Sequence, residues 1–279
     1  MIFVQIASYR DPQLIPTVED CIAKAKHPEN LSFGIAWQHG PHELLGPILN
    51  HKRVQVIDIP HTGSKGACWA RSLINSILYS GEDYTLMIDS HHRFAQDWDQ
   101  TLIDMLESLP GKPVLTTYAP SFDPETDDKV DNPWIMKFDP GHSLDFPLFR
   151  PAYSDHEAPM LTYCFSAHFA FARGQFILDV PYDPNLYFHG EEITMAVRAF
   201  THGYDLYHPH KVVLWHEYTR KNRQKHWDDD KDWWQMDTRA KERVRSILAG
   251  DIPDQIGHVR TIQEYFTLSG HNVPKRSSA

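Results

Sequence analysis

The tripeptide Asp89-Ser90-His91 combines residue types that can bind a metal ion. It directly follows a short apolar run, Tyr84 to Ile88, that has the length and composition of a buried strand. Residues two apart on an extended segment point to the same side, so Asp89 and His91 can share one divalent cation. An oxygen and nitrogen ligand set of this kind suits manganese. Taken alone, the tripeptide also fits a turn at a strand end, where Asp and Ser are common.

A second histidine, His216, is placed where it could complete such a site. It stands in Trp215-His216-Glu217-Tyr218, after a strand-like run from Lys211 to Trp215. A side chain at the carboxyl end of a strand can reach the same edge of a sheet as the tripeptide. His216 is also one of 18 histidines in the chain, and taken alone it is better explained by a surface turn, because most histidines are not ligands.

Two acidic residues, Glu191 and Glu192, follow His189-Gly190 at the start of a helical pattern. The helix dipole favours carboxylates in a first turn, so helix-start chemistry accounts for the pair. A carboxylate here could also orient a reacting hydroxyl or stabilise positive charge on a reacting carbon.

The basic residues Lys65 and Arg71 flank a glycine-containing helix start, GSKGACWARSL. The planar fork of Arg71 suits phosphate oxygens, and a solvated arginine explains the residue equally well. The spacing GxxxxGK[ST] of a phosphate-binding loop does not occur here, so ATP hydrolysis has no support.

The elements that must position these residues alternate between strands and helices. This order predicts a sheet that is at least partly parallel, with crossover helices. Ligands then bind outside the carboxyl ends of the strands, which selects Ser8-Tyr9-Arg10-Asp11 as well as Asp89-Ser90-His91. The expected strands are 2–7, 31–37, 54–59 and 84–88, and the expected helices are 14–25, 66–78 and 98–109.

The second half of the chain has a different character. Residues 120–159 are rich in Pro, Asp and Phe without a sustained period, which predicts a long irregular insertion whose aromatic residues form an ordered wall. A strand pair is expected within 161–172, a helix at 191–200, a strand at 211–215 and a helical stretch at 227–249. We expect a catalytic domain over residues 1–225 and a helical extension, 226–279, packed on it.

Composition excludes several classes of protein. A net charge of −10 provides no basic field for nucleic acid. The three cysteines form no CxxC pair, which argues against a thiolate zinc site and against a disulfide framework. No apolar stretch approaches the roughly 20 residues of a membrane span, so we expect a cytoplasmic protein.

Taken together and in this order, five segments resemble a known family. They are SYRDP, the helix start from Gly66 to Arg71, IDSHHRF, FHGEE and WHEYTR. They look like the GlcNAc-transferases that modify hydroxyproline in a ubiquitin-ligase subunit, and more distantly like the mucin-type polypeptide GalNAc-transferases. Both groups are GT-A glycosyltransferases, with a Rossmann-like mixed sheet flanked by helices. The resemblance covers roughly residues 1 to 220.

The resemblance implies a role for each matching residue. Asp89, His91 and His216 would bind Mn²⁺ or Mg²⁺, and Glu191 and Glu192 would be the catalytic acidic pair. The residues expected to bind the donor, a UDP-sugar, are Ser8, Tyr9, Arg10, Asp11, Lys65, Arg71, Ser90, Ser166 and His168.

The implied activity is sugar transfer, most simply of GlcNAc from UDP-GlcNAc, to a hydroxyl of a protein or glycan acceptor with retention of configuration. Two other functions remain open at this stage, because fold does not fix function. One is a metal-dependent hydrolase of nucleotide sugars. The other is a sugar-binding protein on the same fold that has no catalytic activity.

Overall fold

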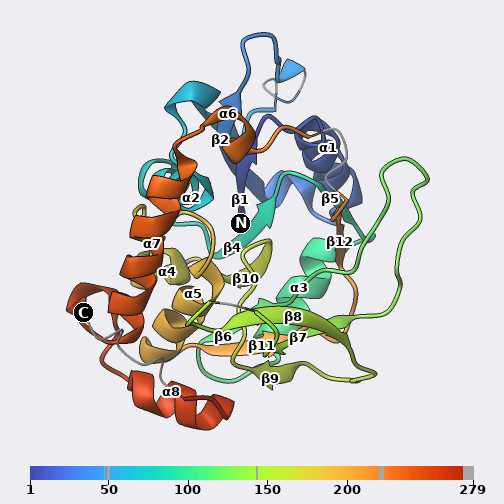
Figure 1. The fold of residues 1–279 in the computed structure, drawn as a ribbon. Coiled ribbons are helices and arrows are strands. Elements are labelled where there is room, and N and C mark those ends of the chain that lie inside the picture. The colour runs from blue at the N-terminus through green and yellow to red at the C-terminus, as the bar shows by residue number, and fades with distance from the viewer. Residues whose placement is uncertain (47, 49–50, 143, 220–222, 273–279) are drawn as a thin grey trace.

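A mixed eight-stranded sheet forms the centre of the molecule (Figure 1). The computed structural model describes residues 1–46, 48, 51–142, 144–219 and 223–272. The strands follow the order β3 (Val54–Pro60), β2 (Leu31–His39), β1 (Ile2–Tyr9), β4 (Tyr84–Asp89), β10 (Phe169–Arg173), β6 (Pro113–Thr116), β11 (Asp205–His208) and β9 (Met160–Thr162).

The first four strands in this order are parallel, and this half of the sheet presents its carboxyl ends to one edge. β10 then runs antiparallel between β4 and β6, and β6 is parallel to β11. Two small sheets complete the strand set: β12 (Leu214–His216) pairs with β5 (His92–Phe94), and β7 (Trp134–Asp139) pairs with β8 (Leu148–Tyr153). The expected α/β class with a mixed central sheet is confirmed.

Side chains of β1 point alternately to the two faces of the sheet and take part in the core on each face. Its residues Val4 and Ile6 belong to a core that also contains Val18 of α1 (Leu14–Lys24) and Leu102 of α3 (Trp98–Glu107). Phe3 points to the other face, where it packs with residues of α2 (Ala67–Leu73) and of its π-helical continuation η4 (Ile74–Leu78). Successive strand residues face opposite sides, so one short strand serves two cores.

A third core holds the second half of the molecule together. It joins α5 (Glu191–Thr201) to the long helix α7 (Trp233–Leu248) and to α8 (Ile262–Ser269). The remaining short helical elements are α4 (Gln175–Asp179), α6 (His226–Asp229), and the 3-10 turns η1 (Pro28–Asn30), η3 (His61–Gly63) and η5 (Pro253–Gln255).

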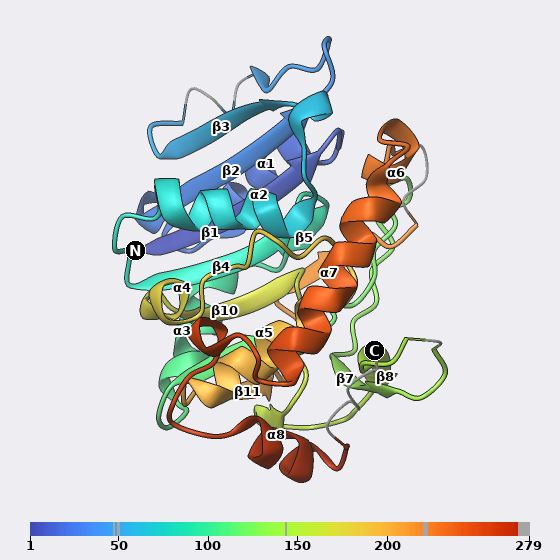
Figure 2. The same ribbon diagram turned by 60° about the vertical axis from the view of Figure 1, so that its left-hand side comes forward.

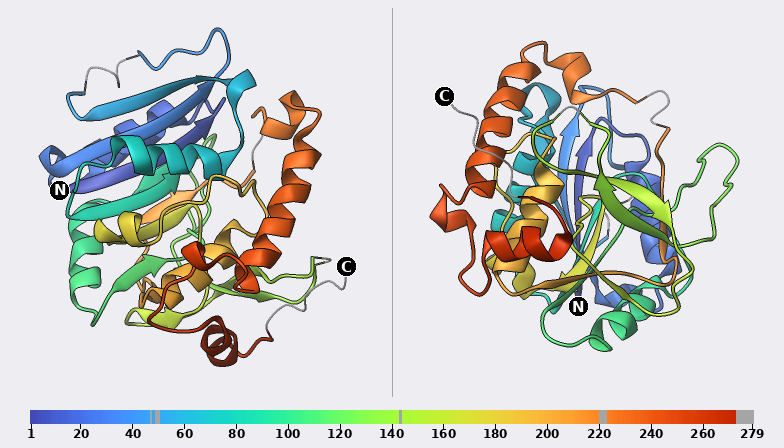
Figure 3. Two further views of the ribbon diagram at one scale, coloured as in Figure 1. Left: turned by 90° about the vertical axis from the view of Figure 1, so that its left-hand side faces the viewer. Right: turned by 60° about the horizontal axis from the view of Figure 1, so that its bottom comes forward.

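The carboxyl edge of the parallel strands is covered by parts of the chain that are distant in sequence. Figure 2 shows β1 running from the N-terminus toward the side on which α6 and α7 lie. Figure 3 shows α7 and the β7–β8 hairpin at this edge from two further directions. Within the described residues, no helix is both long and apolar enough to cross a membrane.

The structure corrects two expectations about the second half of the chain. The insertion 120–159 is not irregular throughout, because its residues 134–139 and 148–153 form the antiparallel hairpin β7–β8. Its aromatic residues stabilise this hairpin, with Phe138 packed edge-on against Phe149 at 5.1 Å between ring centroids. The expected strand pair at 161–172 consists of β9 and β10, which pair with β11 and with β4 and β6 rather than with each other.

Candidate active site

A cavity of about 450 Å³ opens at the carboxyl ends of β1 and β4. This is the edge that the strand order selects for ligand binding in α/β sheets. Its wall includes the residues Tyr9, Asp11, Arg71, Asp89, Ser90, His91, Tyr118, His168, Tyr187, Glu191, Glu192, His216 and Arg223.

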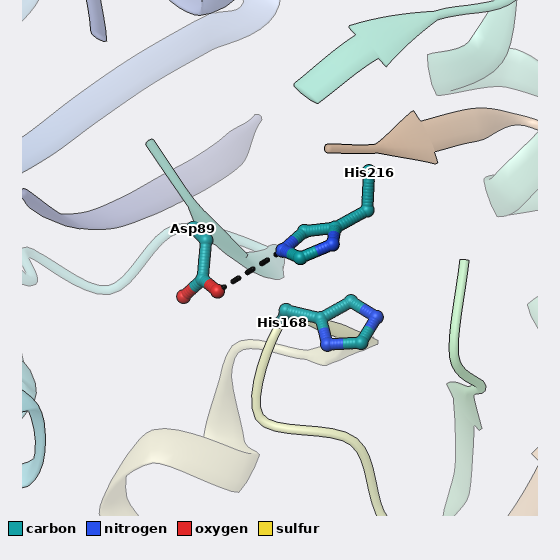
Figure 4. A group of neighbouring side chains, drawn as sticks. All are labelled: Asp89, His168 and His216. Carbon is teal, nitrogen blue, oxygen red and sulfur yellow. Dashed lines mark hydrogen bonds and ion pairs between the residues drawn. The ribbon is translucent and has the colours of Figure 1, made fainter. Parts of the chain in front are cut away.

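Asp89, His168 and His216 face one another in this cavity (Figure 4). Each offers a ligand atom, and these atoms lie within 4.8 Å of one another. Asp89 ends β4, His216 ends β12, and His168 immediately precedes β10. The Nε2 atom of His216 lies 3.3 Å from Oδ2 of Asp89. Three strand ends therefore bring one carboxylate and two imidazoles to one point.

His91 approaches the same carboxylate from another side. Its Nε2 atom lies 3.7 Å from Oδ2 of Asp89, and its ring centroid lies 4.5 Å from that of His216. This Nε2 is buried and has no hydrogen-bond partner among the residues that the structure describes. A buried nitrogen without a partner next to a carboxylate and a second imidazole fits a divalent cation, so the donor set suits the expected metal.

Hydrogen bonds distinguish the two histidines beside His216. The Nδ1 atom of His91 lies 2.8 Å from the carboxylate of Asp11, which can only accept, so the proton of the neutral ring belongs on Nδ1. In His168 the other ring nitrogen is engaged, because Nε2 accepts from the backbone N–H of Ala119 at 3.1 Å and the proton of the neutral ring is again on Nδ1. Burial, the largest effect, holds the pKa of His168 well below its usual value.

Arg71 lies between two carboxylates of the site. Its Nη2 donates to Oδ1 of Asp89 at 2.6 Å, and its Nη1 donates to Oε1 of Glu191. Burial on its own would raise the pKa of Asp89, but the hydrogen bond with His216 and the charge of Arg71 hold that pKa well below its usual value. Arg71 lines the cavity as expected of a donor contact, while both of its terminal nitrogens bind the protein's own carboxylates.

Glu192 stands at the start of α5 with both carboxylate oxygens engaged. Oε2 accepts from the hydroxyl of Tyr118, and Oε1 accepts from the backbone N–H of Ala167 at 3.1 Å. Burial raises the pKa of Glu192 to about 7, although both hydrogen bonds lower it. Its proton affinity is therefore poised near neutrality, as in groups that exchange protons or sense charge during a reaction.

The last residue of β1 and the two residues after it contact a segment more than 200 positions away in sequence. Asp229 of α6 accepts from the hydroxyl of Tyr9 at 2.7 Å and from Nη1 of Arg10 at 2.9 Å. Asp11 accepts from Nη1 of Arg223 at 2.6 Å. Burial, the largest single effect, would raise the pKa of Asp11, but the hydrogen bond with His91 and the charge of Arg223 outweigh it and lower that pKa to about 2.

Four expected donor residues lie away from the cavity wall. Lys65 is exposed over the ring of Trp69, at 5.7 Å from the ring centroid. Arg10 binds Glu43 and Asp229, and Ser8 and Ser166 are fully buried beneath the site.

Sequence reasoning missed Tyr118, Tyr187, Arg223 and Asp229. No local spacing relates these residues to the site, since Tyr118 follows a strand that pairs non-locally and Arg223 and Asp229 lie on the segment that folds back across the edge.

Two solved structures share this architecture. A structure of GalNAc-T7 with UDP, GalNAc and Mn²⁺ matches with a TM-score of 0.62 and 12% identity, over 97% of this chain and 55% of that chain. A structure of residues 1–349 of S. aureus TarS in complex with UDP-GlcNAc matches with a TM-score of 0.55 and 12% identity, over 88% of this chain and 66% of that chain. This chain therefore spans between about half and two thirds of these proteins. The shared fold is that of GT-A glycosyltransferases.

The family follows from the sequence. This chain belongs to the family described as Glycosyltransferase (GlcNAc), whose model matches residues 1–48 and 42–269. No curated protein matches the sequence.

Proposed function

We propose that this protein transfers GlcNAc from UDP-GlcNAc to an acceptor hydroxyl, with a divalent cation at Asp89, His91 and His216 and with retention of configuration. The observation that supports this most directly is the meeting of Asp89 with the two histidines beside the acidic pair of α5. The family description and the UDP-GlcNAc in the TarS structure favour GlcNAc, and the Mn²⁺ in the GalNAc-T7 structure favours manganese.

The three ligand residues supply one carboxylate and two imidazoles, a set that suits Mn²⁺. A bound divalent cation would act as a Lewis acid that neutralises charge growing on the leaving diphosphate. Arg71 prepares Asp89 for this role, because it occupies Oδ1 and leaves Oδ2 facing both histidines.

Glu191 and Glu192 border the cavity where the sugar and acceptor would meet. Arg71 engages Glu191, and Tyr118 and Ala167 engage both oxygens of Glu192. Held in this way, neither carboxylate is poised as a covalent nucleophile. This arrangement supports attack from the face of the leaving group, with Glu192 stabilising positive charge at the sugar carbon. We expect Glu192→Gln to lower kcat about 10²–10⁴-fold.

The acceptor side of the cavity is formed by the hairpin residues Pro147, Leu148 and Phe149 and by Phe188 and Trp227. An apolar wall here would exclude water from the reacting carbon. The proposed C-terminal extension, 226–279, contributes His226 and Trp227 of α6 to the lining of this cavity.

The function is tested by measuring UDP release and sugar transfer together. Purified protein with UDP-GlcNAc and Mn²⁺ is assayed with and without a panel of glycans and hydroxyproline-containing peptides. We expect acceptor-dependent UDP release and a product with the α configuration by NMR. UDP release that is indifferent to every acceptor would indicate a hydrolase, and donor binding without any release would indicate a sugar-binding protein.

A further inference from the structure

The carboxylate of Asp11 receives four hydrogen bonds from the protein itself. Oδ1 accepts from the backbone N–H of Gln13 at 2.9 Å. Oδ2 accepts from the hydroxyl of Ser90 at 2.7 Å, from Nδ1 of His91 at 2.8 Å and from Nη1 of Arg223 at 2.6 Å. The side chain is only 3% exposed. The acceptor capacity of Asp11 is therefore directed at the protein rather than at a nucleotide.

This arrangement fixes both the orientation and the tautomer of His91. An ionised carboxylate is an acceptor only, so Nδ1 of His91 must carry a proton. In the neutral ring Nε2 then keeps its lone pair, and it lies 3.7 Å from Oδ2 of Asp89. A carboxylate that holds the far nitrogen of an imidazole is the usual partner of a metal-binding histidine.

His168 provides an internal comparison. It also lies beside Asp89 and His216, yet its Nε2 accepts from the backbone N–H of Ala119. In its neutral form the remaining nitrogen, Nδ1, carries the proton and is a donor. Both neutral rings thus carry the proton on Nδ1, but the nitrogen that the partner does not engage is a bare Nε2 in His91 and an N–H donor in His168.

We propose that Asp11 is a positioning residue that makes His91, rather than His168, the imidazole that joins Asp89 and His216 at the cation. The inference rests on the proposed cation site and adds the residue that selects its ligands. Asp11 acts through His91 and contacts neither the cation nor the donor in this role.

The test is Mn²⁺ binding in the absence of donor, measured by calorimetry on the full chain. We expect Asp11→Asn to weaken Mn²⁺ binding about 10–100-fold, as loss of such partners does in other metal sites. Arg223→Gln is the matched control, because it removes another partner of the same carboxylate and leaves His91 untouched. Its Mn²⁺ affinity should equal or exceed that of the wild type, since a nearby positive charge is lost.

Asp11→Asn also removes a negative charge near the cation, and a double-mutant cycle separates this effect from positioning. In a His91→Ala background, Asp11→Asn should weaken the remaining Mn²⁺ binding less than threefold. An equal loss of Mn²⁺ affinity in both backgrounds would show that Asp11 acts only through its charge, and it would overturn the proposal. Wild-type protein that does not bind Mn²⁺ at all would instead contradict the proposed cation site.

A second measurement uses the unmodified protein and does not depend on how the variants fold. Nitrogen-15 NMR of the metal-free chain reports which ring nitrogen of each histidine is protonated. We expect the proton on Nδ1 in both His91 and His168, with the bare Nε2 of His168 hydrogen-bonded and that of His91 not. A proton on Nε2 of His91 would overturn the proposal.

Discussion

Arg71 donates from Nη2 to Oδ1 of Asp89 at 2.6 Å, and its other terminal nitrogen binds Glu191. Its side chain is 3% exposed, so one buried guanidinium group links Asp89, which ends β4, to Glu191, which begins α5. The proposed cation ligand and the acidic pair are therefore held by a single side chain.

Replacing Arg71 should destabilise the fold. Arg71→Met leaves Asp89 and Glu191 as neighbouring carboxylates without their partner, which costs about 3–5 kcal/mol of the free energy of unfolding. Urea unfolding measures the loss. Lys65→Met, at an exposed position in the same segment, is the control and should change stability by less than about 0.5 kcal/mol. Similar losses for both variants would contradict the role given to Arg71.

The raised pKa of Glu192 makes a prediction about stability and pH. Its pKa is about 7 in the folded chain and has an ordinary value of 4.5. Between these values the folded chain binds more protons than the unfolded chain, so this residue lowers the free energy of unfolding as pH rises from about 4.5 through 7. The free energy of unfolding of Glu192→Gln minus that of the wild type should therefore be larger at pH 8 than at pH 5. A stability difference independent of pH would contradict the buried setting of Glu192.

Gly190 connects the C-terminal helix to the acidic pair. It has φ +91°, and a Cβ added there would lie 2.3 Å from Cγ2 of Val244 in α7. Gly190→Ala should cost about 1–3 kcal/mol from backbone strain alone, and the steric overlap adds to this. It should also lower kcat, because it shifts Glu191 and Glu192.

The companion variant Val244→Ala tests the contact itself. Combined with Gly190→Ala, it should recover part of the lost activity, because it removes the overlapping methyl groups. Activity equal to that of Gly190→Ala alone would show that α7 does not set the position of α5.

The hairpin residue Leu148 tests whether the wall of the cavity excludes water. Leu148 lines the cavity from β8. Leu148→Ala should raise the ratio of free GlcNAc to transferred GlcNAc several-fold, because water then reaches the reacting carbon. Chromatography of the labelled products gives this ratio, and Leu178→Ala in α4, at a 60% exposed position, is the control. An unchanged ratio would remove the hairpin from the proposed mechanism.

The sequence predicts the parallel half of the fold well, because each strand there is a short apolar run followed by polar residues. β4 ends at Asp89 as its pattern indicates, and Asp89 and His91 do approach each other. Strand ends of a parallel sheet share one edge, so local patterns were sufficient there.

Other parts of the site depend on pairings that no local pattern encodes. His168 reaches Asp89 because β10 pairs antiparallel with β4. Asp11 was expected at the nucleotide. Its contact with His91 joins the ends of the neighbouring strands β1 and β4, and its contact with Arg223 arises only because the chain returns from β12 to cross the same edge. Arg71 looked like a phosphate contact because the sequence does not reveal that two carboxylates face it.

The central claim is tested most directly by donor binding on the wild type and on Asp89→Ala. Calorimetric titration of UDP-GlcNAc, UDP-GalNAc, UDP-glucose and GDP-mannose is carried out with and without Mn²⁺. We predict that UDP-GlcNAc binds most tightly, that its binding requires Mn²⁺ and that Asp89→Ala abolishes it. A wild-type protein that binds none of these nucleotide sugars in the presence of Mn²⁺ would contradict the proposed function.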